Sequence, residues 1–137
     1  MGRYYHGDIE GKFWFGVQSS TDAEFFGVEG NANFLHYYFD EDNKKDIVKG
    51  KLECERKLGK YKKLLDEFFD TRESYNNKSL QDFLDEKEHP HKHTEEGVRY
   101  YLEWYARLNL GKKIYDCILE QGKCSFEAEL WQQLIVK

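Results

Sequence analysis

The sequence of 137 residues has little proline and cysteine and no linker-like tract. A single proline, Pro90, and the absence of any glycine- or serine-rich stretch leave nothing to separate two domains, so we expect one domain spanning residues 1–137. The three cysteines are odd in number and contain no C-x-x-C pair. This argues against a disulfide framework and against a thiolate zinc site, and we expect reduced, partly buried thiols.

Long apolar runs and an excess of basic charge are also missing. No stretch approaches the roughly 20 apolar residues that cross a bilayer, and the first residues lack the apolar core of a signal peptide. We therefore expect a cytoplasmic protein that does not bind a membrane. The net charge is −5, and acidic and basic residues are interspersed along the chain. Because duplex nucleic acid attracts proteins with a basic stripe, we expect no duplex nucleic acid as a partner.

Aromatic residues are abundant, since 17% of the chain is Phe, Trp or Tyr. Many lie in the first 39 residues, in short runs punctuated by glycine, which is typical of short strands joined by tight turns. Residues 3–6 and 12–18 flank a glycine-bounded turn at 7–11 and predict a hairpin or a sharp corner. Residues 25–28 and 34–39 are the next candidates for extended structure.

The following part of the chain has a helical pattern. Residues 46–58 fit either a strand, by their alternation, or a helix, and pairs of opposite charge four residues apart, such as Lys49 and Glu53, favour the helix. Residues 60–73 predict a second helix, and Ser79 is a candidate N-cap of a third. Pro90 is expected to end that third helix, because proline cannot continue it.

The longest predicted helix begins after Thr94, an oxygen cap followed by two acidic residues, and stops at Gly122. Gly111 falls on its apolar stripe, where a missing side chain would let another element approach closely. The stripe comprises Tyr101, Trp104, Leu108, Gly111, Tyr115 and Ile118.

Residues 124–130 alternate between apolar and polar side chains and predict a terminal strand. Such a strand needs a partner, and the N-terminal strands are the obvious ones. The predicted fold class is therefore α+β: a small, mostly antiparallel sheet, built from the N-terminal strands and a C-terminal strand, and packed by several helices.

The stretches at residues 2–5, 7–15 and 124–130 resemble small proteins carried by bacteriophages and found among marine environmental sequences. The resemblance extends over most of the chain. It implies a single cytoplasmic domain, and it carries no activity and no catalytic residue over to this sequence.

Motifs for catalysis or for an organic cofactor are missing. The stretch at 7–12 differs from a phosphate-binding loop because three residues, not four, separate its glycines, and Phe13 follows its lysine. No G-x-S-x-G nucleophile elbow occurs. We therefore expect no cofactor and leave the catalytic residues unassigned.

Two groups of residues have side chains that bind metal ions. His6, Asp8 and Glu10 surround the first turn and would suit a divalent ion. The second group is His89, His91 and His93, whose imidazoles would share one side of an extended segment and would suit zinc, nickel or copper. A solvated turn and a solvated loop explain the same residues without a metal, and the second group lacks a fourth ligand.

Aromatic residues on a strand face or near a terminus are candidates for contact with a partner, because exposed Trp and Tyr are common anchors at interfaces. Trp14, Tyr37 and Trp131 fit this description. We therefore predict a small non-enzymatic protein-interaction or regulatory module, bound by a protein partner or by a second copy of the chain. The alternative is a metal-dependent hydrolase that uses His6, Asp8 and Glu10.

Overall fold

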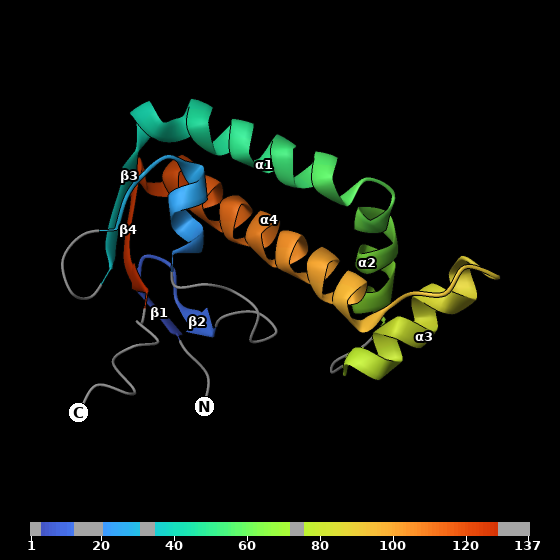
Figure 1. The fold of residues 1–137 in the computed structure, drawn as a ribbon. Helices are drawn as coiled ribbons and strands as arrows, with labels where there is room; N and C mark the ends of the chain where they lie inside the picture. The colour runs from blue at the N-terminus through green and yellow to red at the C-terminus, as the bar shows by residue number, and fades with distance from the viewer. Residues whose placement is uncertain (1–3, 13–20, 31–34, 72–75, 129–137) are drawn as a thin grey trace.

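The computed structural model describes residues 4–12, 21–30, 35–71 and 76–128. It has an α+β fold, as predicted, with the sheet at one end and the two long helices α1 and α4 running away from it (Figure 1). In chain order the elements are β1 (Tyr4–Gly7), β2 (Gly11–Lys12), the 3-10 helix η2 (Asp22–Phe26), β3 (His36–Asp40), the 3-10 helix η3 (Glu41–Asn43), α1 (Lys44–Leu58), α2 (Tyr61–Asp70), α3 (Asn77–Lys87), α4 (Glu95–Gln121) and β4 (Lys123–Ala128).

The sheet joins the two ends of the described chain. Its strand order is β2-β1-β4-β3, and each neighbouring pair is antiparallel. Tyr5 of β1 lies opposite Ala128 of β4, which confirms the predicted pairing of the terminal strand with the N-terminal hairpin. The hairpin is also confirmed over its described residues, since Tyr4 lies opposite Lys12.

Aromatic rings fill the buried face of this sheet. The ring centroid of Phe126 lies 5.6 Å from that of Tyr5, 5.6 Å from that of Tyr37 and 6.2 Å from that of Phe39. All four side chains are buried, and the alternation predicted along β4 places Cys124 and Ala128 on the same face. The core at this end therefore depends on rings, each of which removes a large apolar area from water.

Phe26 lies between α1 and α4 at a glycine on each helix. A β-carbon built on Gly50 would lie 2.7 Å from Phe26 Cδ1, and one built on Gly111 would lie 2.5 Å from Phe26 Cε1. The helix predicted for residues 46–58 is confirmed, and its glycine has a packing role. The close approach predicted at Gly111 is confirmed as well.

The expectation of extended structure at residues 25–28 is wrong, because Asp22–Phe26 form a 3-10 helix. The ring of Phe26 enters the core while Phe25 stays at the surface, and Asp22 pairs with Arg107 of α4 at 3.1 Å. Adjacent side chains point in different directions both in a 3-10 helix and in a strand. A pair of neighbouring aromatic residues therefore could not distinguish a 3-10 helix from a strand.

The ends of α3 and α4 are set by local side-chain contacts. Ser79 is not the cap of α3 but its third residue: the Asn76 side chain accepts from the Ser79 amide at 2.8 Å, and Ser79 Oγ accepts from the Asn76 amide at 3.2 Å. The predicted Thr94 cap is confirmed by its bond from the Gly97 amide at 3.0 Å. Gly122, with φ of 82°, ends α4 in a left-handed conformation.

The stripe predicted on α4 is partly correct. Leu108, Gly111 and Ile118 are buried, whereas Tyr101, Trp104 and Tyr115 are only half-buried. Because α4 packs against α1, η2, α3 and β4, its buried residues cover a wider face than one stripe.

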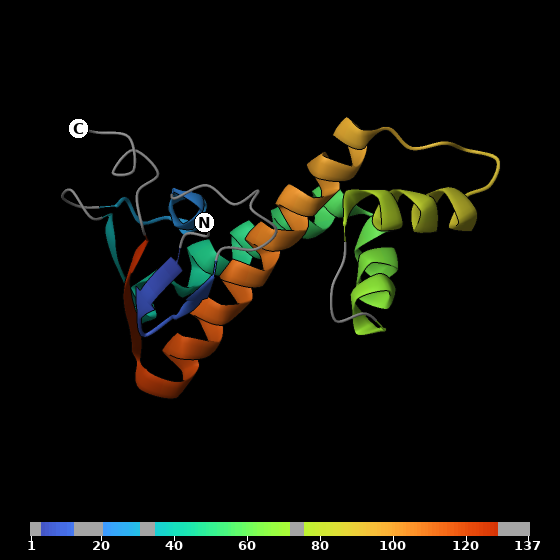
Figure 2. The ribbon, with the colours of Figure 1, turned by 90° about the horizontal axis from the view of Figure 1, so that it is seen from below.

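α2 and α3 lie at the opposite end of α1 and α4 from the sheet, and the connection from α3 to α4 is the most distant part of this end (Figures 1 and 2). Leu65 and Phe68 of α2 and Leu80 and Leu84 of α3 are fully buried there. Helices pack the sheet, as predicted, since α4 and the 3-10 helix η3 contact its strands, whereas α2 and α3 lie away from it. Among the described helices, none combines the length and apolar character required to cross a bilayer.

Candidate metal centre

In the first turn, at residues 7–11, the Asp8 carboxylate has a structural role. Asp8 Oδ2 accepts from the Ser125 amide at 2.9 Å and lies 3.3 Å from Lys123 Nζ. The bond from Ser125 lowers the pKa of Asp8; partial desolvation opposes this effect and the Lys123 ammonium adds to it. His6 and Glu10 are exposed, and among the described residues these three side chains do not form a group of ligand atoms. Asp8 thus fastens the turn to β4.

Of the three aromatic residues predicted to contact a partner, only Tyr37 lies within the described residues. Its side chain is fully buried against Phe126, and its hydroxyl donates to Glu24 Oε2 at 3.3 Å. Burial raises the pKa of Tyr37, with a further increase from Glu24. Tyr37 is therefore a core residue in this structure and offers no surface to a partner. Trp14 and Trp131 lie outside the described residues.

An aromatic surface that the sequence did not predict lies on η2 and α4. The Trp104 ring lies 5.5 Å from that of Phe25 and 6.5 Å from that of Tyr100, measured between centroids. Phe25 is 37% exposed and Tyr100 is 43% exposed. The guanidinium of Arg107 lies over the Trp104 ring at 4.5 Å. Helical periodicity had placed Trp104 in the core, so no sequence signal distinguished this surface.

The connection between α3 and α4 brings three potential metal ligands together. α3 ends at Lys87, and a turn follows in which the His91 amide donates to the Glu88 carbonyl at 2.8 Å. One ligand atom from each of Glu88, His91 and His93 lies within 4.8 Å of the other two. His89 is not in this group, because the chain turns at residues 88–90 and is not extended there. The predicted histidine set is therefore corrected to two histidines and a glutamate.

Glu88 is held by groups from the start of α2. Its Oε1 accepts from the Tyr61 hydroxyl at 2.6 Å, and its Oε2 forms an ion pair with Lys60 Nζ. Burial raises the pKa of Glu88. The hydrogen bonds from Lys60 and Tyr61, together with the charges of Lys60 and of a protonated His93, outweigh this effect and lower the pKa to about 2. Glu88 is consequently a carboxylate at neutral pH.

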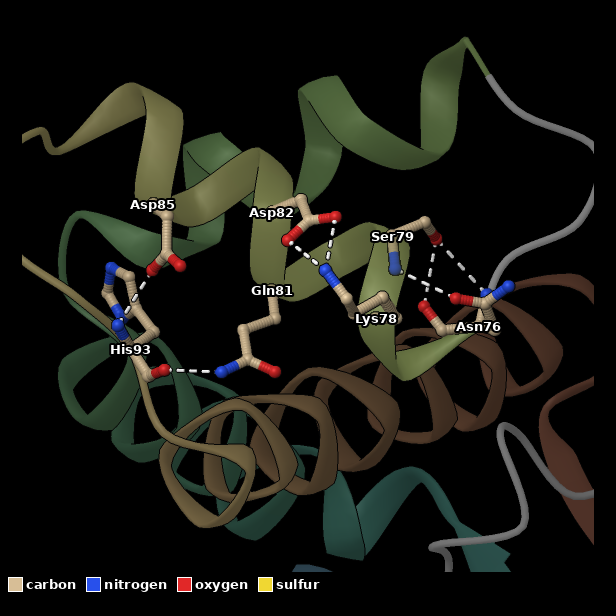
Figure 3. A network of polar contacts seen from close by, with 7 residues as sticks. All are labelled: Asn76, Lys78, Ser79, Gln81, Asp82, Asp85 and His93. Carbon is tan, nitrogen blue, oxygen red and sulfur yellow. Dashed lines mark hydrogen bonds and ion pairs between the residues drawn. The ribbon is translucent and has the colours of Figure 1, made fainter.

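His93 is anchored on both sides of its backbone by α3. Its amide donates to Asp85 Oδ1 at 2.7 Å, and its carbonyl accepts from Gln81 Nε2 at 2.5 Å (Figure 3). Its side chain is only 4% exposed, and the Tyr61 ring packs against the imidazole edge to face at 5.7 Å. The imidazole therefore has a fixed position inside the protein.

His93 Nε2 is buried and has no hydrogen-bond partner among the described residues. It lies 2.9 Å from Glu88 Oε1, which is close enough for a hydrogen bond but not in the direction of one. Buried polar atoms almost always have a partner, and a bound ion is one of the ordinary explanations for an exception. When His93 is protonated this contact is an ion pair, whereas the lone pair of a neutral Nε2 would be able to face a third atom shared with Glu88.

The exposed side of the group borders a hollow in the surface. His91 is exposed, and its ring lies edge to face on that of His93 with centroids 4.7 Å apart. The hollow has a volume of about 420 Å³ and is lined by Lys60, Lys87, Glu88 and His91. Lys87 is paired with Glu67 at 2.8 Å. The open side of the group thus faces a pocket with two ammonium groups at its edge.

Glu88 is the ligand that the sequence did not identify. It stands beside the histidines in the run from 88 to 93, but its role depends on the turn that brings its carboxylate back over His93. Comparison of the chain with protein-family models, with curated proteins and with solved structures gave no significant match. The functional argument therefore depends on the geometry of this group alone.

Proposed function

We propose that this protein is a small non-enzymatic regulatory module that binds one divalent transition-metal ion through Glu88, His91 and His93. The observation that carries the proposal is the buried His93 Nε2, which lacks a hydrogen bond and lies 2.9 Å from Glu88 Oε1. Imidazole nitrogen and carboxylate oxygen are a donor set that zinc accepts, and copper and nickel accept imidazole as well.

The distances suit a tetrahedral ion. With metal–ligand bonds near 2.0–2.1 Å, neighbouring ligand atoms lie about 3.3 Å apart. The Glu88–His93 pair is already at 2.9 Å, and the largest separation in the group is below 4.8 Å. Closing the group therefore requires a shift of at most about 1.5 Å. The exposed His91 side chain is the one able to make it.

The consequence of binding would be to fix the α3–α4 connection. All three ligands come from residues 88–93, and Glu88 is also held by Tyr61 of α2. An ion at this position would therefore tie the starts of α2 and α4 to the end of α3. This local ordering is the physical basis for a regulatory role, because the stability of the corner would then depend on the metal.

Metal titration of the chelator-treated protein tests the proposal. We expect one Zn²⁺ per chain by calorimetry and by elemental analysis after dialysis. His91→Gln should weaken binding by about tenfold or more, because a ligand is lost while the exposed position leaves the fold intact. His89→Gln is the matched control, from the same turn but outside the group, and should bind like the unsubstituted protein. The absence of stoichiometric zinc, or equal losses in the two variants, would contradict the proposal.

Binding of a protein partner or of a second copy stays a prediction. It depended on Trp14 and Trp131, which lie outside the described residues, and on Tyr37, which is buried. The hydrolase based on His6, Asp8 and Glu10 is not proposed here, because Asp8 is bonded to Ser125 and Lys123.

A further inference from the structure

We infer that metal binding turns the hollow beside Glu88 and His91 into a site for a small oxyanion, a phosphate or carboxylate group, held by the metal, Lys60 and Lys87. This inference depends on the proposed metal site and names the ligand that the loaded site would take. It starts from the ion pairs around the hollow.

In the metal-free protein both lysines at the hollow have carboxylate partners, and Glu86 also lies close enough to act on Lys87. Lys60 is paired with Glu88, and Lys87 is paired with Glu67. A divalent ion adds two positive charges and would take Glu88 Oε1, the oxygen beside His93, as its ligand. Lys60 pairs with the other oxygen, Oε2, and its side chain is 70% exposed, so its ammonium group has further N–H groups to offer an anion. The loaded site is consequently more positive by two charges than the metal-free site, which favours an anion in the recess.

Coordination gives the anion a defined place. Three protein ligands leave a tetrahedral ion with one open position, as in zinc sites that bind water or substrate. Glu88 and His91 are both ligands of the group and part of the lining of the hollow, so the ion would border that space. An oxygen of the anion would take the open position, and the other oxygens would accept hydrogen bonds from the two ammonium groups.

The hollow is larger than a bare oxyanion. A volume of about 420 Å³ lies within the range of small-molecule sites, roughly 300–1,000 Å³, and exceeds what a bare oxyanion needs. The hollow therefore has room for an organic group that carries the phosphate or carboxylate. No base or ring is indicated by the lining, so the class is defined by its oxyanion.

Cobalt(II) supplies the test, because its visible spectrum reports changes in its ligands. The Co²⁺-loaded protein is titrated with inorganic phosphate and, separately, with acetate, and we expect a saturable spectral change with at least one of them. Phosphate binding to the metal-free protein, followed by calorimetry, should be absent or weaker by about tenfold.

Two lysine variants distinguish an anion site from simple exchange at the metal. Lys60→Met should bind Co²⁺ at least as tightly as the unsubstituted protein, because an ammonium group that repels the ion is removed. It should bind the anion about tenfold more weakly. Lys87→Met should also lose anion affinity while keeping the metal. Lys63→Met, an exposed lysine of α2 outside the hollow, is the matched control and should change neither affinity.

The outcomes separate the two proposals. Failure of the unsubstituted protein to take up Co²⁺ would overturn the metal function itself. Uptake of Co²⁺ without any response to phosphate or acetate would overturn only the anion site. Equal anion affinities in Lys60→Met and Lys63→Met would also overturn it, because the anion would then be bound by the metal alone.

Discussion

Gly111→Ala should destabilise the protein, although the same change stabilises an ordinary helix. Alanine in place of glycine inside a helix contributes about 1 kcal/mol. At this position the new β-carbon would lie 2.5 Å from Phe26 Cε1, 2.7 Å from Phe26 Cζ and 3.1 Å from Lys51 Cγ. Carbon atoms prefer a separation of about 3.5–4.0 Å. The ring would have to move by about 1 Å to relieve the overlap.

The ring has no space in which to move. Phe26 is completely buried, and the ring also lies against Gly50 of α1, where a β-carbon would be 2.7 Å from Cδ1. Overpacking of this kind costs about 1–3 kcal/mol, and a buried rigid ring held by two helices favours the upper half of that range. After the gain in helix propensity, we expect a net loss of about 1–2 kcal/mol in the free energy of unfolding.

Urea unfolding followed by circular dichroism measures this loss. In thermal melts each kcal/mol should correspond to about 4 °C. Gly97→Ala is the control within the same helix, since its β-carbon would meet only Thr94 Oγ1 within 4 Å, at 3.2 Å. Its free energy of unfolding should be nearly unchanged, because the gain in helix propensity is offset by the tight contact with the capping oxygen. An increase in stability for Gly111→Ala would refute the reasoning. So would strict additivity with Phe26→Leu, because a smaller side chain should relieve the clash and couple the two sites.

Three further outcomes follow from the structure. Asn76→Ala should lower the free energy of unfolding, measured in urea, by about 1 kcal/mol, because the cap of α3 is lost. Lys78→Ala nearby should leave that free energy almost unchanged. Burial, partly offset by Arg107, raises the pKa of Cys54 to about 12, and the other two cysteines are also buried, so a thiol reagent should react only after unfolding. The pKa of Asp8 is lower in the folded protein than its ordinary value, which is near 3.9. This difference stabilises the folded state at pH values above the ordinary pKa, and the stabilisation is lost as the pH falls through the folded pKa. The stability advantage over Asp8→Asn should therefore shrink from pH 6 to pH 3.

Local chemistry made several elements predictable. The Thr94 oxygen, the acidic residues after it and Gly122 fixed both ends of α4, because capping depends on residues within one turn. The alternation around Phe126 predicted both the terminal strand and its buried face, since successive strand residues point to opposite sides. The need of that strand for a partner then predicted its pairing with the N-terminal hairpin.

The remaining features depend on contacts between distant residues. From the sequence alone, Phe25 and Phe26 fit a strand. The structure shows instead that the Phe26 ring lies against Gly50 and Gly111, two residues far away in the sequence. Asn76 and Ser79 are both good caps, and in the structure they form one capping box, with Asn76 as the cap and Ser79 as the third helical residue. The metal group could not be predicted either, because Glu88 faces His93 only after the turn at residues 88–90 has formed.

The contacts of Glu88 also bear on how tightly a metal would be held. An ion beside His93 would take Glu88 Oε1, so Lys60 can stay on Oε2, and the repulsion between its ammonium group and the ion subtracts from the metal affinity. The Tyr61 hydroxyl donates to the same Oε1 and would become an outer contact of the ligand, of the kind that orients ligands in many metal sites. The proposed site would bind its ion reversibly and would not depend on it for folding, because Leu65, Phe68, Leu80 and Leu84 form the adjacent core without it. Reversible occupancy of a preformed corner is what a regulatory site requires, and it distinguishes this group from a structural zinc centre that folds its domain.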